Sequence, residues 1–280
     1  MKELKGKVAV ITGAASGIGE ALAKAFADED MKLVLADIEA DRLAAVEKEI
    51  AATGAEVIAV PTDVTQKDQI EALADKAYDR YGAVHILCNN AGVTSRSGHI
   101  WEIEDLDWAW VTAVNFYGVL YGLQVFVPRM IEGGEEGLIM NTCSFVGLST
   151  GTSSPYGITK HALTRMTEGL HYDLKAVDSK LRAALLLPGA VASDFGLAER
   201  NRPAALMPER DAEEAEEAAG RRERIHNWLQ ENGMPAEEVA GIALEAIKQG
   251  QFYILTEPED TKARLRKRVE GILEGTGPLD

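Results

Sequence analysis

The chain has 280 residues, of which 46% are hydrophobic and 26% are charged, and it contains 26 glycines. This is the composition of a soluble globular protein, and it fits neither the fibrous nor the disordered class. The formal net charge of −16 argues against a nucleic-acid partner, because contacts with phosphate need clustered lysines and arginines.

The N-terminal segment, MKELKGKVAVITG, lacks the long apolar region and the cleavage site of a signal peptide. No apolar run approaches the length of a membrane span, so no membrane partner is expected. The two cysteines, Cys88 and Cys143, have neither a metal-ligand nor a redox spacing, and the five histidines show no metal spacing. These features predict a reduced, cytoplasmic protein without a bound metal.

Apolar, β-rich runs alternate along the chain with longer segments of helical period. The predicted strands are 7–12, 32–37, 56–61, 84–89, 137–142, 181–188 and 252–256. The predicted helices are 17–29, 39–53, 66–81, 104–131, 155–177 and 235–249. This alternation predicts a Rossmann-type doubly wound α/β fold: a seven-stranded parallel sheet with helices on both faces, in a single domain over residues 1–280.

Two segments near the C-terminus depart from this alternation. Residues 195–234 are longer than an ordinary connection and follow the carboxyl end of a strand, which predicts a helical lid over a substrate. The acidic block at 209–217 would also fit a solvated helical face. Residues 259–275 have an amphipathic pattern that predicts a packed C-terminal helix. The apolar face of that helix consists of Leu265, Val269, Ile272 and Leu273.

Three glycines, Gly13, Gly17 and Gly19, lie between the first predicted strand and the first predicted helix. Glycine permits a positive φ and close approach of the backbone, and the free N–H groups of a helix start attract an anionic pyrophosphate. A tight turn would explain one such glycine, but three at this place favour a phosphate site. Their spacing is T-G-x-x-x-G-x-G.

This spacing resembles the cofactor motif of the short-chain dehydrogenase/reductase family of the classical type. Further resemblances are NNAG at 89–92, Asn115, YGITK at 156–160 and PGAVAS at 188–193, in the order that the family shows. The resemblance implies an NAD(P)-dependent oxidoreductase that forms a homodimer or homotetramer. Apolar surface left over on the two longest predicted helices would suit such an interface.

Asp37 ends the second strand, where a carboxylate can accept hydrogen bonds from the adenosine ribose. It would repel the 2′-phosphate of NADP, and neither Ala15 nor Ile38 supplies a compensating cation, so NAD is the predicted cofactor. A helix N-cap is the alternative role for Asp37. The resemblance implies cofactor contacts from Gly13, Ser16, Gly17, Ile18, Gly19, Asp37, Asp63, Val64, Asn90, Ala91, Gly92, Tyr156, Lys160, Pro188, Gly189, Val191 and Ser193.

Tyr156 and Lys160 are four residues apart, so a helix would place both side chains on one face. A tyrosine titrates near pH 10 and needs a nearby cation to act as a base at neutral pH, which Lys160 would provide. By resemblance, Tyr156 moves the proton of the alcohol, Lys160 also binds the nicotinamide ribose, and Asn115 holds a water that links Lys160 to solvent.

A third group must hydrogen-bond the reacting oxygen. The segment NTCSFVG resembles the family's N-x-S-S segment and so indicates Ser144. Counting back the family's usual thirteen residues from Tyr156 would instead indicate Cys143. We favour Ser144, because a loop shortened by one residue is easier to absorb than a shifted strand end, and because a thiol is a weak donor.

These residues predict an enzyme that interconverts a hydrophobic secondary alcohol and its ketone, with an aromatic or steroid-like substrate as one option. The pocket should be formed by residues 93–99, the loop 145–155 and the lid. Its apolar candidates are Phe145, Val146, Leu148, Phe195, Leu197 and Leu206. The alternatives are a non-catalytic dinucleotide sensor, or a nucleotide-sugar epimerase or dehydratase, which would share the Y-x-x-x-K pattern.

Overall fold

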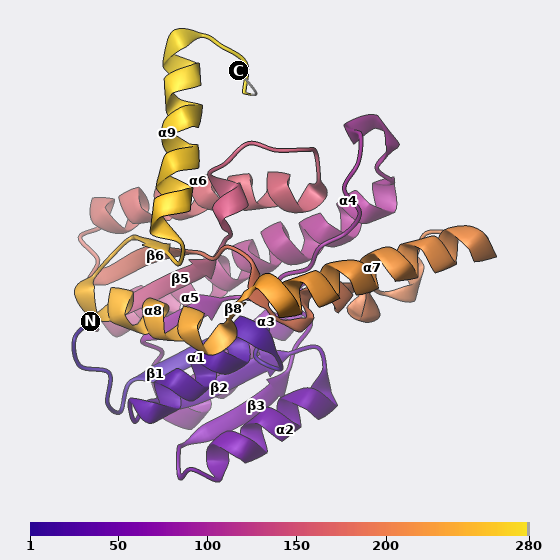
Figure 1. Ribbon diagram of the computed structural model, residues 1–280. Coiled ribbons are helices and arrows are strands. Elements are labelled where there is room, and N and C mark those ends of the chain that lie inside the picture. Colours follow the sequence, from indigo (N-terminus) through magenta and orange to yellow (C-terminus); the bar gives the residue numbers. More distant parts are fainter. Residues whose placement is uncertain (279–280) are drawn as a thin grey trace.

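A computed structural model describes residues 1–278 of the chain, and its centre is a sheet of seven parallel strands (Figure 1). The strand order is β3-β2-β1-β4-β5-β6-β9. The strands are β1 (Val8–Thr12), β2 (Lys32–Asp37), β3 (Val57–Pro61), β4 (Ile86–Asn89), β5 (Gly137–Thr142), β6 (Leu181–Leu187) and β9 (Tyr253–Leu255). This confirms the predicted Rossmann-type sheet.

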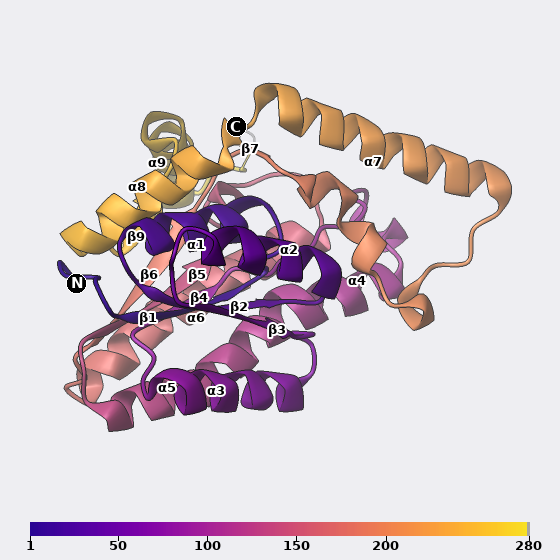
Figure 2. The same ribbon diagram turned by 90° about the horizontal axis from the view of Figure 1, so that it is seen from below.

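Helices cover both faces of the sheet, as Figure 2 shows. One face carries α1 (Gly17–Asp28), α2 (Ala40–Ala51) and α8 (Ala236–Gln249), and the other carries α3 (Lys67–Tyr81), α5 (Val119–Gly133) and α6 (Pro155–Ala176). Along β1, Ala9 and Ile11 belong to the first apolar layer, while Val8 and Val10 belong to the second. Because strands buried on both faces need no polar alternation, their sequences read as continuous apolar runs.

The helix predicted at 104–131 is interrupted in the structure. It consists of α4 (Asp105–Thr112), a π-helical turn η2 (Ala113–Gly118) and α5. The whole stretch Asp105–Gly133 is long and apolar enough to cross a membrane, but 61% of its most apolar window is buried inside the protein. There α4 packs on α6 and α5 packs on α3, as expected for a core helix.

The chain beyond β6 leaves the sheet and returns to it. It passes through β7 (Val191–Ala192), η4 (Asp194–Asn201), η5 (Ala204–Leu206), α7 (Ala212–Asn232) and β8 (Met234–Pro235). The strands β7 and β8 pair in parallel and close the base of this excursion. The helix α7 extends well beyond the rest of the molecule (Figures 1 and 2). Two further 3₁₀ turns are η1 (Ile100–Glu102) and η3 (Phe145–Gly147).

The C-terminal helix α9 (Pro258–Glu274) forms where the sequence predicts it, but the prediction that its apolar face is packed is wrong for most of that face. Ile272 is 67% exposed and Leu273 is 81% exposed. The reason is geometric: α9 projects from the sheet, and its contacts lie in its first turns and at Arg268, which donates to the carbonyl oxygen of Leu148 at 2.6 Å (Figure 1).

The strand order places the site. From β1 the chain builds outward through β2 and β3, and it then returns to place β4 on the other side of β1. Since the connections leave in opposite directions, a crevice opens at the carboxyl ends of β1 and β4, which is where open α/β sheets bind ligands.

Candidate active site

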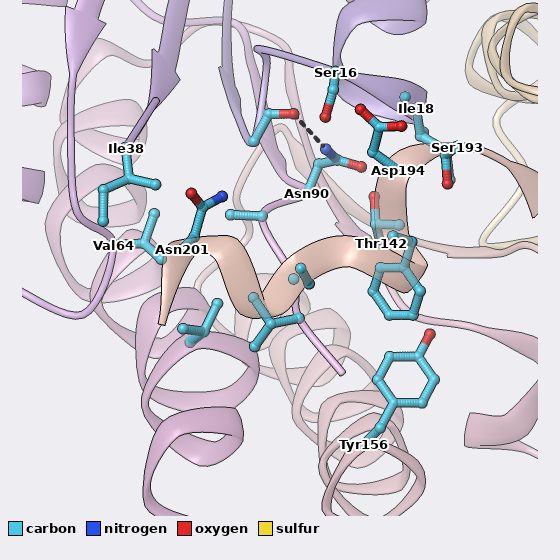
Figure 3. Close-up of a pocket in the computed structure, with 18 of the residues that line it drawn as sticks. Ser16, Ile18, Ile38, Val64, Asn90, Thr142, Tyr156, Ser193, Asp194 and Asn201 are labelled. Carbon is cyan, nitrogen blue, oxygen red and sulfur yellow. Dashed lines mark hydrogen bonds between the residues drawn. The ribbon is translucent and has the colours of Figure 1, made fainter. Parts of the chain in front are cut away.

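A cavity of about 810 Å³ lies at this crevice, and it brings together most of the residues that the sequence indicates. Those that line it are Gly13, Ser16, Gly17, Ile18, Asp37, Asp63, Val64, Asn90, Ala91, Gly92, Ser144, Tyr156, Lys160, Pro188, Gly189, Val191 and Ser193. Gly19 and Asn115 lie behind the wall of the cavity. Figure 3 shows Ile38 and Val64 at one end of the cavity and Tyr156 at the other.

The glycine turn between β1 and α1 is suited to a phosphate. Gly13 and Gly17 have φ values of 69° and 56°, which disfavour any other residue. A Cβ on Gly13 would lie 2.8 Å from the Cα of Ala91, so the turn also needs glycine for space. The N-cap of α1, Ser16, makes no side-chain capping bond, so the N–H groups of the first turn remain available to an anion.

Gly19 has a packing role in the structure. A Cβ at this position would overlap the carbonyl oxygen of Gly13 and would lie 2.6 Å from Nδ2 of Asn90. That amide nitrogen donates to the carbonyl oxygen of Thr12 at 3.0 Å and ties the segment after β4 to the end of β1. Gly19 therefore shapes the turn from behind instead of lining the cavity.

Asp37 is fixed at the cavity edge by two backbone groups. Its Oδ2 accepts a hydrogen bond from the N–H of Ala15, and its Oδ1 accepts one from the N–H of Glu39, both at 3.0 Å. The N-cap of α2 is Glu39, so Asp37 does not take the alternative role of N-cap. Its carboxylate is held at the end of β2, where an adenosine ribose would lie in a fold of this type.

The other end of the cavity holds Tyr156 and Lys160, one turn apart on α6. The Lys160 Nζ lies 5.5 Å from the centroid of the Tyr156 ring, and it donates a hydrogen bond to the carbonyl oxygen of Thr142 at 2.7 Å. Burial lowers the pKa of Lys160 to about 8, so the ammonium is mostly charged at neutral pH.

The phenol of Tyr156 differs from the sequence-based expectation in one respect. Burial raises its pKa above the ordinary value, and a hydrogen bond with Ser144 opposes this rise without cancelling it. Desolvation therefore outweighs any effect of the neighbouring lysine. At neutral pH the phenol is protonated and can donate a proton to an acceptor in the cavity.

The two candidates for the third polar group point in different directions. The Cys143 Sγ donates to the carbonyl oxygen of Lys160 at 3.2 Å and lies 3.4 Å from Oγ1 of Thr164, so the thiol faces the backbone of α6. Burial raises its pKa, and the thiol stays protonated. Ser144 instead lines the cavity with Tyr156, and its hydroxyl, which donates to the carbonyl oxygen of Pro188 at 3.4 Å, acts to lower the pKa of the Tyr156 phenol. Of the two, the geometry supports Ser144.

Asn115 is fully buried in the π-helical turn η2. Its Oδ1 accepts from the N–H of Val93 at 2.8 Å, and its Nδ2 donates to the carbonyl oxygen of Val93 at 2.9 Å. The wider turn presents this side chain to the segment after β4, one layer behind the cavity wall. Both Asn115 Oδ1 and Lys160 Nζ approach Gly92, because a Cβ there would lie 3.6 Å from each.

Around Tyr156 the wall of the cavity is apolar. Of the six apolar candidates, Phe145, Phe195 and Leu206 line the cavity, while Val146, Leu148 and Leu197 do not. Val93 lines the cavity within the predicted range 93–99, and Ala198, Trp228 and Leu229 line it within the predicted lid, although none of the four was named as an apolar candidate; Trp110 lies outside the predicted ranges and was missed. Trp228 and Leu229 belong to α7, whose sequence is mostly polar, so the sequence signal for them was only the length of the segment 195–234.

The helical turn η4 crosses the cavity. In Figure 3 it runs from Asp194, beside Ser193, to Asn201, beside Ile38 and Val64. The ring of Phe195, near its start, lies 5.3 Å from the ring of Tyr156, centroid to centroid. Residues 194–201 thus cover both ends of the site.

Buried charge anchors this covering segment. The side chain of Arg202 is fully buried, and its Nη1 donates to Oδ1 of Asp107 on α4 at 2.7 Å. Glu199 lies 3.3 Å from the same nitrogen, and it also pairs with Arg210 and Arg222. The sequence analysis identified none of these pairs.

Comparison with known proteins agrees with this geometry. A family model described as short chain dehydrogenase matches residues 7–203. The crystal structure of a short chain dehydrogenase/reductase from Burkholderia phymatum in complex with NAD is 41% identical in sequence, with a TM-score of 0.94, and the match covers 100% of this chain and 99% of that one.

Two curated proteins are similar over nearly the whole chain. The CLA biosynthesis dehydrogenase/reductase of Lactiplantibacillus plantarum is 34% identical over 260 residues, which are 92% of this chain and 91% of the relative. The 1-deoxy-11-beta-hydroxypentalenate dehydrogenase of Streptomyces exfoliatus is 32% identical over 273 residues, which are 96% of this chain and 89% of the relative. The family model spans the sequence from β1 to η4, and the chain therefore belongs to the short-chain dehydrogenase/reductase family of oxidoreductases.

Proposed function

We propose that the protein is an NAD-dependent dehydrogenase that interconverts a hydrophobic secondary alcohol and its ketone. One observation carries this proposal: a single cavity has a phosphate-type glycine turn and Asp37 at one end, and Ser144, Tyr156 and Lys160 at the other. Such a cavity can hold a dinucleotide with its reacting end beside a buried phenol.

The residues of the cavity fit NAD. The first turn of α1 and the glycine turn would bind the pyrophosphate, and Asp37 would accept hydrogen bonds from the adenosine ribose. The NAD complex of the similar protein from Burkholderia phymatum supports this assignment. When bound, the nicotinamide supplies the acceptor or donor of a hydride.

The chain's own residues handle the proton. In ketone reduction, Oη of Tyr156 donates its proton to the developing alkoxide, and in alcohol oxidation the tyrosinate oxygen takes the proton back. Ser144 hydrogen-bonds the same reacting oxygen. Lys160 stabilises the tyrosinate by its charge, and Asn115 fixes the backbone of Val93 beside it. Burial raises the pKa of Tyr156, so the fraction of tyrosinate grows as the pH rises above neutrality. We therefore expect the rate of alcohol oxidation to rise with pH in this range.

Replacing Ser144 and Cys143 one at a time with alanine shows which of them hydrogen-bonds the reacting oxygen. We expect Ser144→Ala to lower kcat by about 10²-fold or more, because the reacting oxygen loses a fixed donor. Cys143→Ala should change kcat by less than about threefold, since its thiol faces α6. Steady-state kinetics of both variants provide the measurement. A larger loss in Cys143→Ala would show that the count back from Tyr156 was the better guide.

The substrate class follows from the wall around Tyr156. Among the described residues that line this end, Val93, Trp110, Phe145, Phe195 and Leu206 are all apolar. Lys160 is the one cation there, and its Nζ is already bonded to the backbone. An uncharged, hydrophobic substrate fits such a wall better than a phosphorylated one. The name of the Streptomyces relative, a dehydrogenase of a hydroxylated pentalenate, supports oxidation of a hydroxyl on a hydrocarbon frame.

A substrate panel tests the function. We expect purified protein to reduce NAD with at least one hydrophobic secondary alcohol, with a lower rate when NADP replaces NAD. The absorbance of reduced nicotinamide measures both rates. A panel without turnover, in a protein that binds NADH tightly, would favour the sensor; a strong preference for NADP would contradict the role of Asp37.

Two further features support proposals about the whole protein. The segment 195–234 serves as the substrate lid of a single domain, since η4 crosses the cavity.

Tyr172 on α6 and Tyr117 near α5 are exposed, and such apolar surface supports a homodimer or homotetramer. Both cysteines are free thiols, in keeping with a cytoplasmic location.

A further inference from the structure

Glu39 lies two residues beyond Asp37, at the adenosine end of the cavity, and it binds the lid. Its carboxylate accepts hydrogen bonds from Nε (3.1 and 3.2 Å) and Nη2 (2.6 Å) of Arg200, and from Nδ2 of Asn201 at 2.9 Å. A second guanidinium group, that of Arg42, lies 3.6 Å from the same carboxylate. One carboxylate thus occupies two arginines.

Asp194 holds the same arginines from the other side. Arg42 Nη2 donates to Oδ2 of Asp194 at 2.6 Å, and Arg200 Nη1 donates to its carbonyl oxygen at 3.2 Å. The bond from Arg200 to Asp194 does not involve Glu39, so the guanidinium group of Arg200 would stay at the cavity edge if the charge of Glu39 were lost. Burial favours a higher pKa for Glu39, but the Arg200 and Asn201 hydrogen bonds outweigh it, and the carboxylate is charged at neutral pH.

We propose that Glu39 is a specificity-determining residue that excludes NADP by occupying the guanidinium group of Arg200. This inference rests on the NAD-dependent function proposed above. A 2′-phosphate needs cationic donors, and guanidinium groups are well suited to bind it through parallel hydrogen bonds. Arg200 lines the cavity at the adenosine end, but its guanidinium group is already bound by the carboxylate of Glu39, while Arg42 lies beside the cavity and pairs mainly with Asp194.

The two carboxylates would then have different tasks. Asp37 would bind the ribose hydroxyls directly and repel a phosphate by its own charge. Glu39 would keep the guanidinium group of Arg200 from binding the phosphate and so from offsetting that repulsion. Two places in the structure would therefore discriminate between NAD and NADP. One is Asp37 at the end of β2, and the other is the ion pair between Glu39 and Arg200 of the lid.

The variant Glu39→Gln tests this division. Wild-type and variant protein are titrated with NADH and with NADPH, and nucleotide fluorescence gives both dissociation constants. We expect the ratio of NADPH affinity to NADH affinity to rise at least about tenfold, since a repelling charge is lost and charge-assisted donors are freed. Added salt should diminish the gain, because the new contact is between exposed charges.

Three further variants make the result specific. Glu56→Gln removes one negative charge from an exposed side chain that pairs with Lys32 outside the cavity, and it should leave the ratio unchanged. The double variant Glu39→Gln with Arg200→Gln should lose the gain, because the freed donor is absent. Glu39→Ala replaces Glu39→Gln if the latter does not fold, and carries the same expectation.

The outcomes are distinguishable. An unchanged ratio in the Glu39 variant would overturn the inference, and so would an equal gain in Glu56→Gln or in the double variant. In each of these cases NADH binding by the wild type would leave the proposed function standing. A wild-type protein that bound neither nucleotide would instead overturn the proposed function and this inference with it.

Discussion

Replacing Tyr156 with Phe should lower kcat by about 10³-fold, within the range expected for the loss of a general acid and base. The substitution removes only the phenolic oxygen, and the ring keeps its contact with Phe195. The dissociation constant of NADH should change far less than kcat, because the glycine turn and Asp37 lie at the opposite end of the cavity. Steady-state kinetics and fluorescence titration with NADH measure the two quantities.

Tyr172→Phe is the matched control. It makes the same chemical change on the same helix, but its side chain is exposed and lies outside the cavity. Its kcat should equal that of the wild type within experimental error. If Tyr156→Phe retained most of the activity, the phenol would not carry the proton, and the proposed mechanism would fail at its central step.

Asp107→Asn should destabilise the protein by roughly 3 kcal/mol, because it removes the charge that compensates the buried guanidinium of Arg202. Glu199 remains nearby, but Asp107 is the nearer and more deeply buried partner. For a chain of this size the loss corresponds to a fall in Tm of about 6 to 12 °C. Thermal unfolding followed by circular dichroism gives the shift.

The control for this change lies two residues away on the same helix. Asp105→Asn removes an equal charge from an exposed position in the first turn of α4, where the expected loss is below about 1 kcal/mol. Trypsin digestion complements the melting curves, since release of Arg202 should expose the lid before the sheet unfolds. Equal Tm values for the two variants would contradict the role assigned to the buried pair.

The sheet was predictable because its central strands are buried on both faces and leave continuous apolar runs in the sequence. The positions of Gly13, Asp37, Tyr156 and Lys160 followed from their places at strand ends and on one helical face. These features depend on neighbours within a few residues, where periodicity and spacing carry the information.

The contacts that hold the segment 195–234 in place were not predictable in the same way. Its anchoring pairs join residues far apart in sequence, such as Glu39 with Arg200 and Asp107 with Arg202. Each of these residues alone looks like ordinary surface charge, because nothing local distinguishes a buried arginine from a solvated one. The prediction that the apolar face of α9 is packed was wrong for a related reason. A sequence pattern shows that a face is apolar, but it does not show what covers that face.

The π-helical turn η2 changes the direction in which the side chains of α5 point relative to those of α4. A π-helical turn contains an extra residue relative to an α-helical turn, and an α-helix advances about 100° per residue. The side chains of α5 are thus rotated relative to those of α4, so that α4 faces α6 while α5 faces α3. Deleting one residue from Ala113–Gly118 would turn one half of the helix against the other. The long helix therefore presents two packing surfaces at different angles, one on α4 and one on α5. The number of residues between these surfaces is as constrained as their apolar composition.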